Sequence, residues 1–465
     1  MKYMNGNSKI LINSAIGETR MAQIENGQVT DLRLYRDHDP SYIGAIYLGR
    51  VISLSKELQA AFVELAKGFT GFLPLKNLPK RQGKKPNDLT TLLHEGQRII
   101  VQVTADAIKD KLVKLTGRVE LISSAIVLHP FRGGAYVSSR IKDPDKREEL
   151  KQFGEQMDLG EIGLTFRTDA QSIPLSELAS TAQKMIDHWS QISKDTEKMK
   201  CPSLLTQGPD PIEQIMRDYL KNDIEEIIID QAAAFKQAKL WAQTFAPDMT
   251  DRLVIYQEKT PLFSQYEVDD VIEQICSEKI SLKSGAWITI EATEAMTVID
   301  VNTGAAQFSS DPQMQIFSIN SEATREIFRQ LKLRGIGGII IIDFINMENK
   351  GQVKSLLNFI DDLILKDPEP VQRGNISPLG LLALTRKSSR KNLHDLLIRK
   401  NVSIKNTETV CLDILRGAEN DARSNPGLPL VIKVNKNEKK WFEDHSIVFD
   451  QFLTRTGSNL SMEMK

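Results

Sequence analysis

Two segments decide the fold of this chain: EATEAMTVIDVNTG (291–304) and GGIIIIDFINM (337–347). The first continues the apolar AWITI and predicts two strands over 286–302 joined at EATEA, and the second predicts another buried strand. Between them, SINSEATREIFRQLKLRG (318–335) carries apolar side chains at helical spacing. A strand, a helix and a strand in this order predict a mostly parallel or mixed sheet with helices packed on it.

The helix expected over 318–335 has suitable residues at both ends. Asn320 or Ser321 is expected as the N-cap, because either side chain accepts a hydrogen bond from a free backbone N–H. Gly335 is expected as the C-cap, where the backbone turns left-handed. QVKSLLNFIDDLILKD (352–367) predicts the next helix, so residues 286–399 are expected to form an α/β layer.

Polar residues stand at the ends of the two strands. Asp300 and Asn302 are two positions apart and therefore lie on one face of a strand. Asp343 follows an apolar run, where an unpaired and desolvated carboxylate is costly. If the strands are neighbours, the two Asp side chains meet at one edge of the sheet. They would suit Mg²⁺, which takes one or two carboxylates and keeps several waters, and Asn302 would orient a phosphate or the attacking water.

A structural interpretation of these acidic residues stays open, because an apolar strand that ends in Asp is often a cap or a core salt bridge. The strand also resembles a Walker B strand, but the chain contains no GxxxxGK[ST], which disfavours a P-loop NTPase. GIGG (335–338) lacks the spacing of a dinucleotide-binding loop. The six His are scattered without HExxH, which disfavours a zinc hydrolase.

Composition and charge describe an ordinary soluble protein. The chain has 465 residues, and 60 Lys and Arg balance 61 Asp and Glu, which excludes a histone-like polycation but not a local basic face. The three cysteines form no CxxC pair, so neither disulfides nor a zinc ribbon is supported. The N-terminus shows no signal peptide, and the run IGGIIIIDFI (336–345) is too short to span a membrane. We therefore expect a cytoplasmic protein without membrane association.

The N-terminal third predicts two β-structures. Residues 8–35 alternate as strands, with ENG (25–27) as a hairpin turn. Five short strands then follow within about 80 residues, which suggests a small closed barrel of the OB type. The expected strands are 46–53, 59–66, 70–75, 97–106 and 111–121. Further along, CPSLLTQGPDP (201–211) is expected to be a linker.

The barrel carries residues suited to single-stranded nucleic acid. Phe62 and Phe72 lie in adjacent expected strands, and Lys111, Lys114 and Arg118 follow. Aromatic rings stack on bases and cations contact phosphates, although Phe62 and Phe72 could equally be core residues. A second basic cluster, LTRKSSRKNLH (384–394), is either a phosphate-contacting rim or a solvated helix face.

Together these residues resemble the ribonuclease E/G family of bacterial endoribonucleases. The resemblance covers most of the chain, from ILINSA near the start to ETVCLDILR (408–416), with 291–347 as its most specific segment and AAFVELAKGFTGFLPL (60–75) similar to the S1-type barrel. It implies an α/β multidomain fold: an RNase H-like domain interrupted by an S1-type OB-fold barrel and a 5′-sensor domain, then a DNase I-like catalytic domain. The expected ranges are a first RNase H-like segment (1–37), the S1-type barrel (38–120), the 5′-sensor domain (121–205), a second RNase H-like segment (206–280), the DNase I-like domain (281–400) and a small C-terminal domain (401–465).

The resemblance also implies a function: an Mg²⁺-dependent endoribonuclease of RNA processing or decay that cleaves single-stranded RNA and leaves 5′-phosphate and 3′-hydroxyl ends, with Mn²⁺ as an alternative ion. The metal-binding residues fall on Asp300 and Asp343, with Asn302 as the third catalytic residue. The implied RNA contacts are Phe62, Phe72 and Lys111, and the implied grip on a 5′-monophosphate is Arg167 with Thr168 in GLTFRTDA (163–170).

The sequence departs from the family pattern in several places. The stretch LHDLLIRKNVSIKNTETVC (393–411) has no CPxC zinc link, so no zinc is expected and a homodimer would form without it. FIDM of the family is FINM here, with Asn346, a double Arg appears as Ser139–Arg140, and an Arg becomes Pro378. The missing zinc link and Asn346 motivate one alternative, a non-catalytic RNA-binding processing factor. A DNA-directed nuclease that uses the same site is a third possibility.

Overall fold

The computed structural model describes residues 8–39, 41–79, 92–107, 112–157, 159–194, 196, 198–220, 224–304, 311–387, 392–399 and 402–465. The chain divides into two compact units. Unit 1 comprises Met1–His38 and Tyr256–Lys465, and unit 2 comprises Asp39–Ile255. Each unit is described by itself below.

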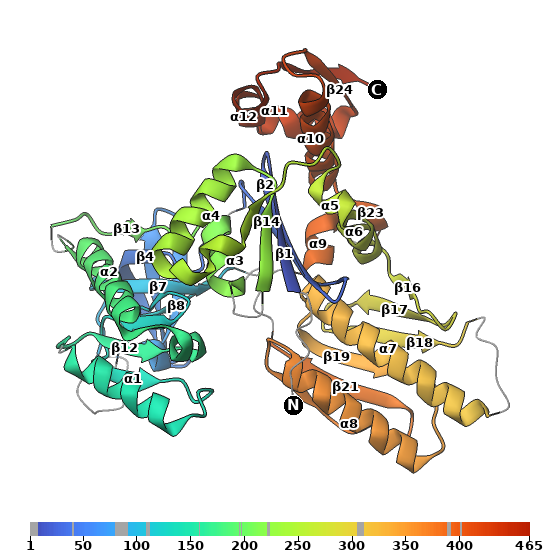
Figure 1. Ribbon diagram of the computed structural model, residues 1–465, viewed down its shortest axis with the longest axis horizontal. Coiled ribbons are helices and arrows are strands. Elements are labelled where there is room, and N and C mark those ends of the chain that lie inside the picture. The colour runs from blue at the N-terminus through green and yellow to red at the C-terminus, as the bar shows by residue number, and fades with distance from the viewer. Residues whose placement is uncertain are drawn as a thin grey trace. The chain divides into compact units, whose positions relative to one another are not determined.

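Unit 1 contains a six-stranded mixed sheet (Figure 1). Its strands, in spatial order, are β16 (Lys279–Ser281), β17 (Trp287–Ala292), β18 (Met296–Asn302), β19 (Gly338–Asp343), β21 (Leu381–Arg386) and β20 (Val371–Arg373). Its strand pairs are antiparallel except β18–β19, which is parallel. The expectation of a mixed sheet built on 286–302 and 337–345 is confirmed.

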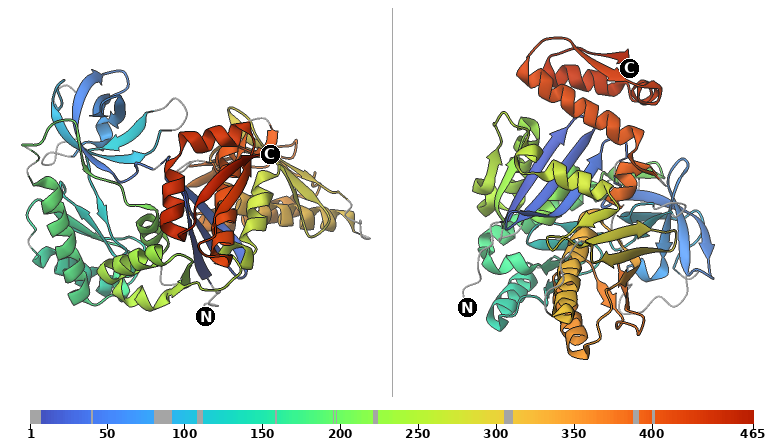
Figure 2. Two further views of the ribbon diagram at one scale, coloured as in Figure 1. Left: turned by 90° about the horizontal axis from the view of Figure 1, so that it is seen from above. Right: turned by 90° about the vertical axis from the view of Figure 1, so that its right-hand side faces the viewer.

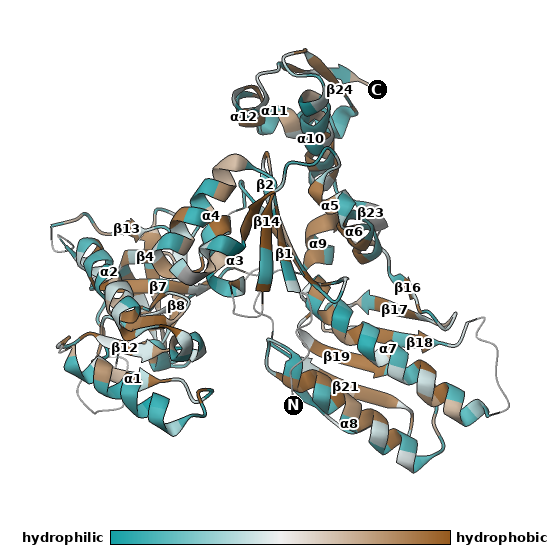
Figure 3. Ribbon diagram, in the orientation of Figure 1, coloured by the Kyte–Doolittle hydropathy of each residue, from teal (hydrophilic) through white to brown (hydrophobic). Residues whose placement is uncertain are grey.

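Two helices cover one face of this sheet. α7 (Pro312–Arg334) and α8 (Lys350–Lys366) pack side by side over it, and Figure 1 shows both on the same side. Alternate strand residues such as Ile299, Ile340 and Ile342 are buried beneath them in one apolar core with Leu356 and Ile360 of α8. In Figure 3 strands β19 and β21 are mostly brown, whereas α7 and α8 are of mixed colour. The intervening strand residues therefore lie on the opposite face.

The start of α7 differs from the sequence expectation. The helix begins at Pro312, and Asp311 is its N-cap, with the Asp311 carboxylate accepting the N–H of Met314. Asn320 is therefore in mid-helix, fully buried, where its amide bonds the backbone C=O and N–H of Ile345. The expected cap at Asn320 or Ser321 is wrong, because the helical spacing continues upstream to the Asp-Pro pair, a strong helix start. Gly335 is the C-cap as expected, with φ of 69°.

Unit 1 also holds an N-terminal antiparallel sheet and a small C-terminal layer. β1 (Ser8–Ala15), β2 (Glu18–Glu25) and β3 (Gln28–Arg36) pair in order, and Asn26 and Gly27 both have positive φ in the turn, which confirms the hairpin at 25–27. α10 (Thr407–Ser424) runs from these strands to the C-terminal layer (Figures 1 and 2). That layer consists of β24 (Leu430–Val434), α11 (Lys436–Asp444), α12 (Ile447–Thr456) and β25 (Leu460–Met464).

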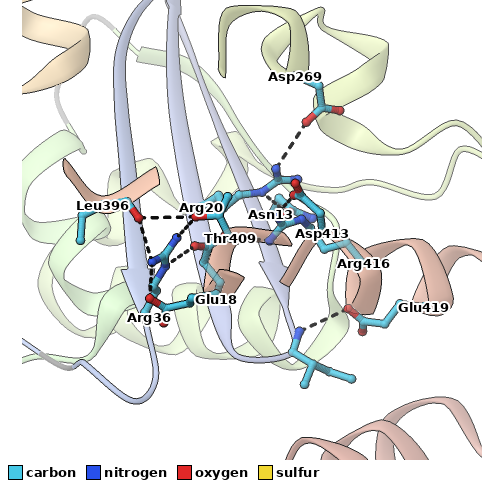
Figure 4. Close-up of polar contacts among 12 residues, drawn as sticks. Asn13, Glu18, Arg20, Arg36, Asp269, Leu396, Thr409, Asp413, Arg416 and Glu419 are labelled. Carbon is cyan, nitrogen blue, oxygen red and sulfur yellow. Dashed lines mark hydrogen bonds and ion pairs between the residues drawn. The ribbon is translucent and has the colours of Figure 1, made fainter. Parts of the chain in front are cut away.

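A buried charge network fastens α10 to the N-terminal sheet (Figure 4). The carboxylate of Glu18 accepts from Arg36 Nε at 3.0 Å and from Arg416 Nη1 at 2.7 Å, so each of its oxygens has a guanidinium partner. Arg36 also donates to Glu408 Oε2 at 2.7 Å and to Thr409 Oγ1 at 3.0 Å. The side chain of Glu18 is 2% exposed and that of Arg36 is 4% exposed, so these are ion pairs away from water.

The remaining elements of unit 1 connect these structures. They are α5 (Leu262–Gln265), α6 (Val268–Cys276), α9 (Leu393–Leu397), β22 (Ile398–Arg399) and β23 (Val402–Lys405). No helix among the described residues of either unit combines the length and the apolarity that a bilayer span requires.

A closed five-stranded barrel is the main feature of unit 2. β4 (Ile46–Ser55), β5 (Ala60–Ala66), β6 (Phe69–Pro74), β8 (Val113–Thr116) and β7 (Arg98–Ala105) pair in that order, and β7 returns to β4 to close it. Its interior holds apolar side chains such as Val63, Leu73 and Leu115. The OB-type expectation is confirmed at the level of strands and closure. β13 (Ser203–Thr206) pairs with β4, so the expected linker over 201–211 is partly wrong.

Unit 2 also contains a second small sheet. Its strands are β11 (Gly134–Val137), β12 (Gly163–Phe166), β10 (Ile126–His129) and β9 (Leu121–Ile122), and α1 (Pro144–Gln156), the 3₁₀ turn Thr168–Ser172 and α2 (Leu175–Ser193) belong with them. α3 (Pro211–Tyr219), β14 (Ile224–Ile229), α4 (Ala232–Phe245), the 3₁₀ turn Pro247–Arg252 and β15 (Leu253–Ile255) follow. The six domain ranges expected from the sequence stay predictions.

Candidate active site

The parallel pairing of β18 with β19 brings the two acidic strand ends together. Asp300 and Asp343 are partners in register, so their Cα atoms face each other across one strand spacing of about 4.8 Å. Their side chains point to the same face, opposite the one that α7 and α8 cover, because Ile299, Val301 and Ile342 occupy the buried positions between them. Asp343 is exposed and Asp300 is partly exposed.

Asn302 belongs to the same face as Asp300, two residues further along β18. Its Nδ2 donates a hydrogen bond to Asp300 Oδ2 at 2.6 Å. This bond fixes the rotation of the Asp300 carboxylate, as polar partners commonly do for metal-ligating carboxylates. The expectation that Asp300 and Asn302 share a strand face is therefore met by a direct contact.

Two further contacts hold the segment that follows Asp343. Asn320 of α7 bonds both backbone groups of Ile345, as described above. On the other side, the backbone N–H of Phe344 donates to the C=O of Gly380 in the turn before β21, at 3.4 Å. Asp343 thus lies at the end of a strand whose continuation is tied to two neighbouring elements, which limits how far its carboxylate can move.

The surroundings of the Asp300–Asp343 pair suit a hydrated cation. Within the portion of the chain that the structure describes, neither carboxylate makes an ion pair with Lys, Arg or His, so both are available to a ligand. Among the described residues no group of three or more His, Cys, Asp or Glu gathers as a metal site. Two carboxylates with open solvent beside them match Mg²⁺, which completes its octahedron with water, better than zinc, which takes four protein ligands in structural sites.

The barrel presents two aromatic side chains outside its core. Phe62 of β5 and Phe72 of β6 are register partners, and their ring centroids are 5.9 Å apart in an edge-on arrangement. Both are partly exposed and are absent from the barrel's apolar core, whereas Tyr47 is 6% exposed and belongs to it. Lys114 of β8 is the exposed register partner of Phe72. The core alternative for Phe62 and Phe72 is therefore not favoured.

The other residues singled out from the sequence are placed as follows. Arg167 comes at the end of β12, where its Nη1 donates to the backbone C=O of Ser123 at 2.7 Å, and Thr168 begins the following 3₁₀ turn. Ser139 and Arg140 are exposed in the turn after β11. Lys111, and residues 388–391 of the second basic cluster, lie outside the described residues.

The sequence of this chain matches two family models. Residues 120–389, more than half of the chain, match the Ribonuclease E/G family, and residues 42–106 match the S1 RNA binding domain. The chain belongs to the ribonuclease E/G family. The S1 match falls on the closed barrel, and the family match includes both strands that carry Asp300 and Asp343.

Similar curated proteins are the ribonucleases G and E of this family. The chain is 32% identical to Ribonuclease G of Haemophilus influenzae over 425 residues, which is 88% of this chain and 86% of that protein. It is 30% identical to Ribonuclease G of Escherichia coli K12 over 88% of the chain and 87% of the relative. Against Ribonuclease E of Haemophilus influenzae the identity is 33%, over 89% of the chain and 46% of the relative. Membership of this ribonuclease E/G family makes the protein an endoribonuclease.

Sequence reasoning missed the positioning contact of Asn320. A buried polar side chain within the apolar stripe of a helix needs hydrogen-bond partners, and that rule could have identified it as a structural group rather than as a cap. Its partner could not have been named, because Ile345 lies 25 residues away and the contact depends on how α7 crosses the sheet.

Proposed function

We propose that this ribonuclease E/G family member is an Mg²⁺-dependent endoribonuclease that cleaves single-stranded RNA in cytoplasmic RNA processing or decay, with rRNA, tRNA or mRNA as substrates. Mn²⁺ is the alternative ion, and the products carry 5′-phosphate and 3′-hydroxyl ends. The observation that carries the proposal is the register of Asp300 with Asp343 on neighbouring parallel strands, on a face left open by the helices. The S1 match on the barrel supports RNA as the substrate.

Each residue at the site has a separate role in the proposed reaction. Asp300 and Asp343 would hold the metal ion, whose bound form supplies an activated water and neutralises the charge that develops on the scissile phosphate. Asn302 restrains the Asp300 carboxylate through its 2.6 Å hydrogen bond. The Asn302 amide has a second N–H and a carbonyl oxygen, which can orient the phosphate or the water at the edge of the pair. Asn320 keeps Asp343 in place through the backbone of Ile345.

RNA binding outside the cleavage site would use unit 2. Phe62 and Phe72 offer ring faces for stacking on unpaired bases, and Lys114 stands beside them as a cation for phosphate. Lys111 is proposed for the same role from the resemblance alone. Arg167 and Thr168 are proposed to hold a 5′-monophosphate through charge-assisted hydrogen bonds, since the side chain of Arg167 is already anchored by Ser123. A homodimer without a zinc link is proposed as the assembly.

Metal dependence tests the proposed function directly. The purified protein should cleave a 5′-monophosphorylated single-stranded oligoribonucleotide in Mg²⁺ and lose all cleavage when the divalent ions are removed by chelation. Restoring Mg²⁺ or Mn²⁺ should restore cleavage, and end-group analysis should find 5′-phosphate and 3′-hydroxyl termini. A DNA strand of the same sequence is the control for the sugar. RNA binding without cleavage under either ion would instead favour the non-catalytic processing factor, and equal cleavage of DNA would favour the DNA-directed nuclease.

A second prediction concerns the barrel. Phe72→Ala, and separately Phe62→Ala, should weaken the binding of single-stranded RNA by roughly 5- to 150-fold, since one stacked base contributes about 1–3 kcal/mol. Fluorescence anisotropy with a labelled oligoribonucleotide measures this loss. Tyr47→Phe, in the barrel core, removes only a hydroxyl and is the matched control. Unchanged affinity in both Phe variants would assign the two rings to packing.

A further inference from the structure

The open face of the six-stranded sheet carries a row of residues in register with the Asp300–Asp343 pair. Thr289 of β17 pairs with Asp300, and Lys279 of β16 pairs with Thr289. Side chains of directly opposed residues point to the same side of a sheet, so Lys279 lies on the face of Asp300. Two strand spacings, about 9.6 Å between Cα atoms, separate the two residues. Figure 1 shows β16 to β19 side by side in this order.

The position of the Lys279 ammonium is defined by Trp287. Lys279 Nζ lies 3.8 Å from the centroid of the Trp287 ring, within the range of a cation–π contact. Trp287 is the register partner of Asn302, the residue that restrains Asp300, so the two side chains leave neighbouring strands side by side. Along the described chain, no carboxylate lies within ion-pair distance of Lys279, and the residue is exposed. Within the described residues, the lysine is therefore a cation oriented by an aromatic ring and without a carboxylate partner.

Trp287 also packs against the turn that follows Asn302. Gly304 has φ of 58°, and a Cβ at Gly304 would lie 2.6 Å from Cζ3 of the Trp287 ring. The indole thus approaches the backbone at Gly304 so closely that only glycine fits there. One ring consequently touches both the loop beside the Asp pair and the ammonium of Lys279, which links the two in space.

Charge is distributed unevenly along this face. One row along the strands from Asp300, on the side away from Asn302 and Trp287, β17 contributes the exposed carboxylate of Glu291, opposite Val298. The Lys279 ammonium lies over Trp287, which is one row from Asp300 in the direction away from Glu291, so phosphates of a bound RNA strand are attracted there and repelled near Glu291. A strand whose scissile phosphate lies at Asp300 and Asp343 therefore runs towards Lys279.

We infer that Lys279, held over the indole of Trp287, binds a backbone phosphate of the RNA next to the scissile one. The inference rests on the proposed function, because it places the scissile phosphate at the Asp300–Asp343 pair. Trp287 is a positioning residue in this arrangement: it orients Lys279 and the turn at Gly304 without contacting the phosphate itself. The contact recognises the sugar–phosphate chain, so it raises affinity for RNA of any sequence and aligns the strand across the metal site.

The salt dependence of binding tests the contact with Lys279. In an Asp300→Asn background, which keeps the RNA intact, Lys279→Ala should weaken binding several-fold with no change in sequence preference. It should also reduce the slope of log K against log salt by about 0.7, the value for one phosphate contact on a single strand. Lys279→Arg should retain both affinity and slope. Lys354→Ala, on the exposed side of α8 across the sheet, removes the same charge and should change neither.

Uncharged linkages in the RNA backbone identify which phosphate Lys279 contacts. A methylphosphonate is placed in turn at each linkage near the cleavage site. A neutral linkage that replaces a contacted phosphate should weaken the binding of the RNA to the protein. At one position this loss of affinity should disappear in Lys279→Ala. Trp287→Phe, which keeps a ring, should bind RNA nearly as well as the parent, whereas Trp287→Ala should lose some of the salt slope. The inference is overturned if the unmodified protein cleaves RNA but Lys279→Ala keeps the full salt dependence of RNA binding. It is equally overturned if every neutral linkage weakens the binding of Lys279→Ala as much as that of the unmodified protein. Absence of cleavage in the unmodified protein, by contrast, defeats the proposed function, and the binding series still decides the role of Lys279.

Discussion

Asp300→Asn and Asp343→Asn are each expected to lower the rate of RNA cleavage by roughly 10³-fold or more. The two carboxylates are register partners on parallel strands and are the proposed protein ligands of the metal ion. Metal-assisted charge stabilisation contributes several kcal/mol, and each 1.4 kcal/mol is a factor of about ten in rate. Asn has the shape of Asp but lacks its charge, so the loss reports the ligand and not the packing. Single-turnover cleavage at saturating RNA measures it.

Binding and additivity sharpen the test of the Asp pair. The affinity for RNA should not fall in either variant, because each variant removes a negative charge from a face that must accept phosphate. Asp300→Asn with Asp343→Asn should be hardly slower than either single variant, since residues that act as a unit show non-additive effects. Raising the Mg²⁺ concentration should partly rescue the single variants.

A matched carboxylate serves as the control for the Asp pair. Asp362 lies exposed on α8, on the helix-covered side of the same sheet. Asp362→Asn should leave cleavage within about twofold, as expected for a surface substitution of up to about 0.5 kcal/mol. Full activity in both Asp300→Asn and Asp343→Asn would show that the metal ion of the reaction does not bind at this face of the sheet.

The elements of this site could be predicted from the sequence because, within each segment, the hydrophobic period and the turn residues favour the same structure. Alternation in MTVIDVN places Asp300 and Asn302 on one strand face, and Asn26-Gly27 between two alternating strands is a hairpin signal that the structure bears out. The apolar run before Asp343 marked its strand. For these segments the hydrophobic period and the turn chemistry point to one structure, which is why element types were right even where boundaries shifted.

What the sequence could not provide is the register between segments far apart in the chain. Asp300 and Asp343 could have met at one sheet edge or missed each other by a residue, which would have turned one side chain to the buried face. The same limit hid Lys279, an ordinary surface lysine in the sequence. Only the antiparallel pairing of β16 with β17 brings it into the row of the Asp pair.

The second large effect is expected on stability: Glu18→Ala should lower the free energy of unfolding of unit 1 by about 3–5 kcal/mol. The substitution leaves Arg36 and Arg416 without the carboxylate that both of them share. Removing one partner of a buried ion pair costs this much because the remaining charge stays desolvated. Arg36 keeps Glu408 and Arg416 keeps Asp413, which should hold the loss within this range.

The effect of Glu18→Ala should depend on pH with a defined sign. Burial opposes the ionisation of Glu18, but the charges of Arg416, Arg36 and Arg20 together outweigh it and lower its pKa below the usual 4.5. A carboxyl group whose pKa is lower in the folded state adds stability that is complete above its unfolded pKa and is lost as pH falls through the folded value. The difference between the unmodified protein and Glu18→Ala should therefore be constant near neutral pH and shrink below about pH 4.5.

Hydrogen exchange locates the loss within the molecule. Amides of α10 and of β1 to β3 should exchange faster in Glu18→Ala, because the Glu18 network joins these elements (Figure 4). The barrel strands β4 to β8 belong to unit 2 and provide an internal reference whose protection should not change. Glu25→Ala, at the other end of β2, removes a partly exposed carboxylate and should cost about 0.5 kcal/mol or less. Equal stability of Glu18→Ala and Glu25→Ala would mean that the two arginines are hydrated and that α10 is held by its apolar contacts alone.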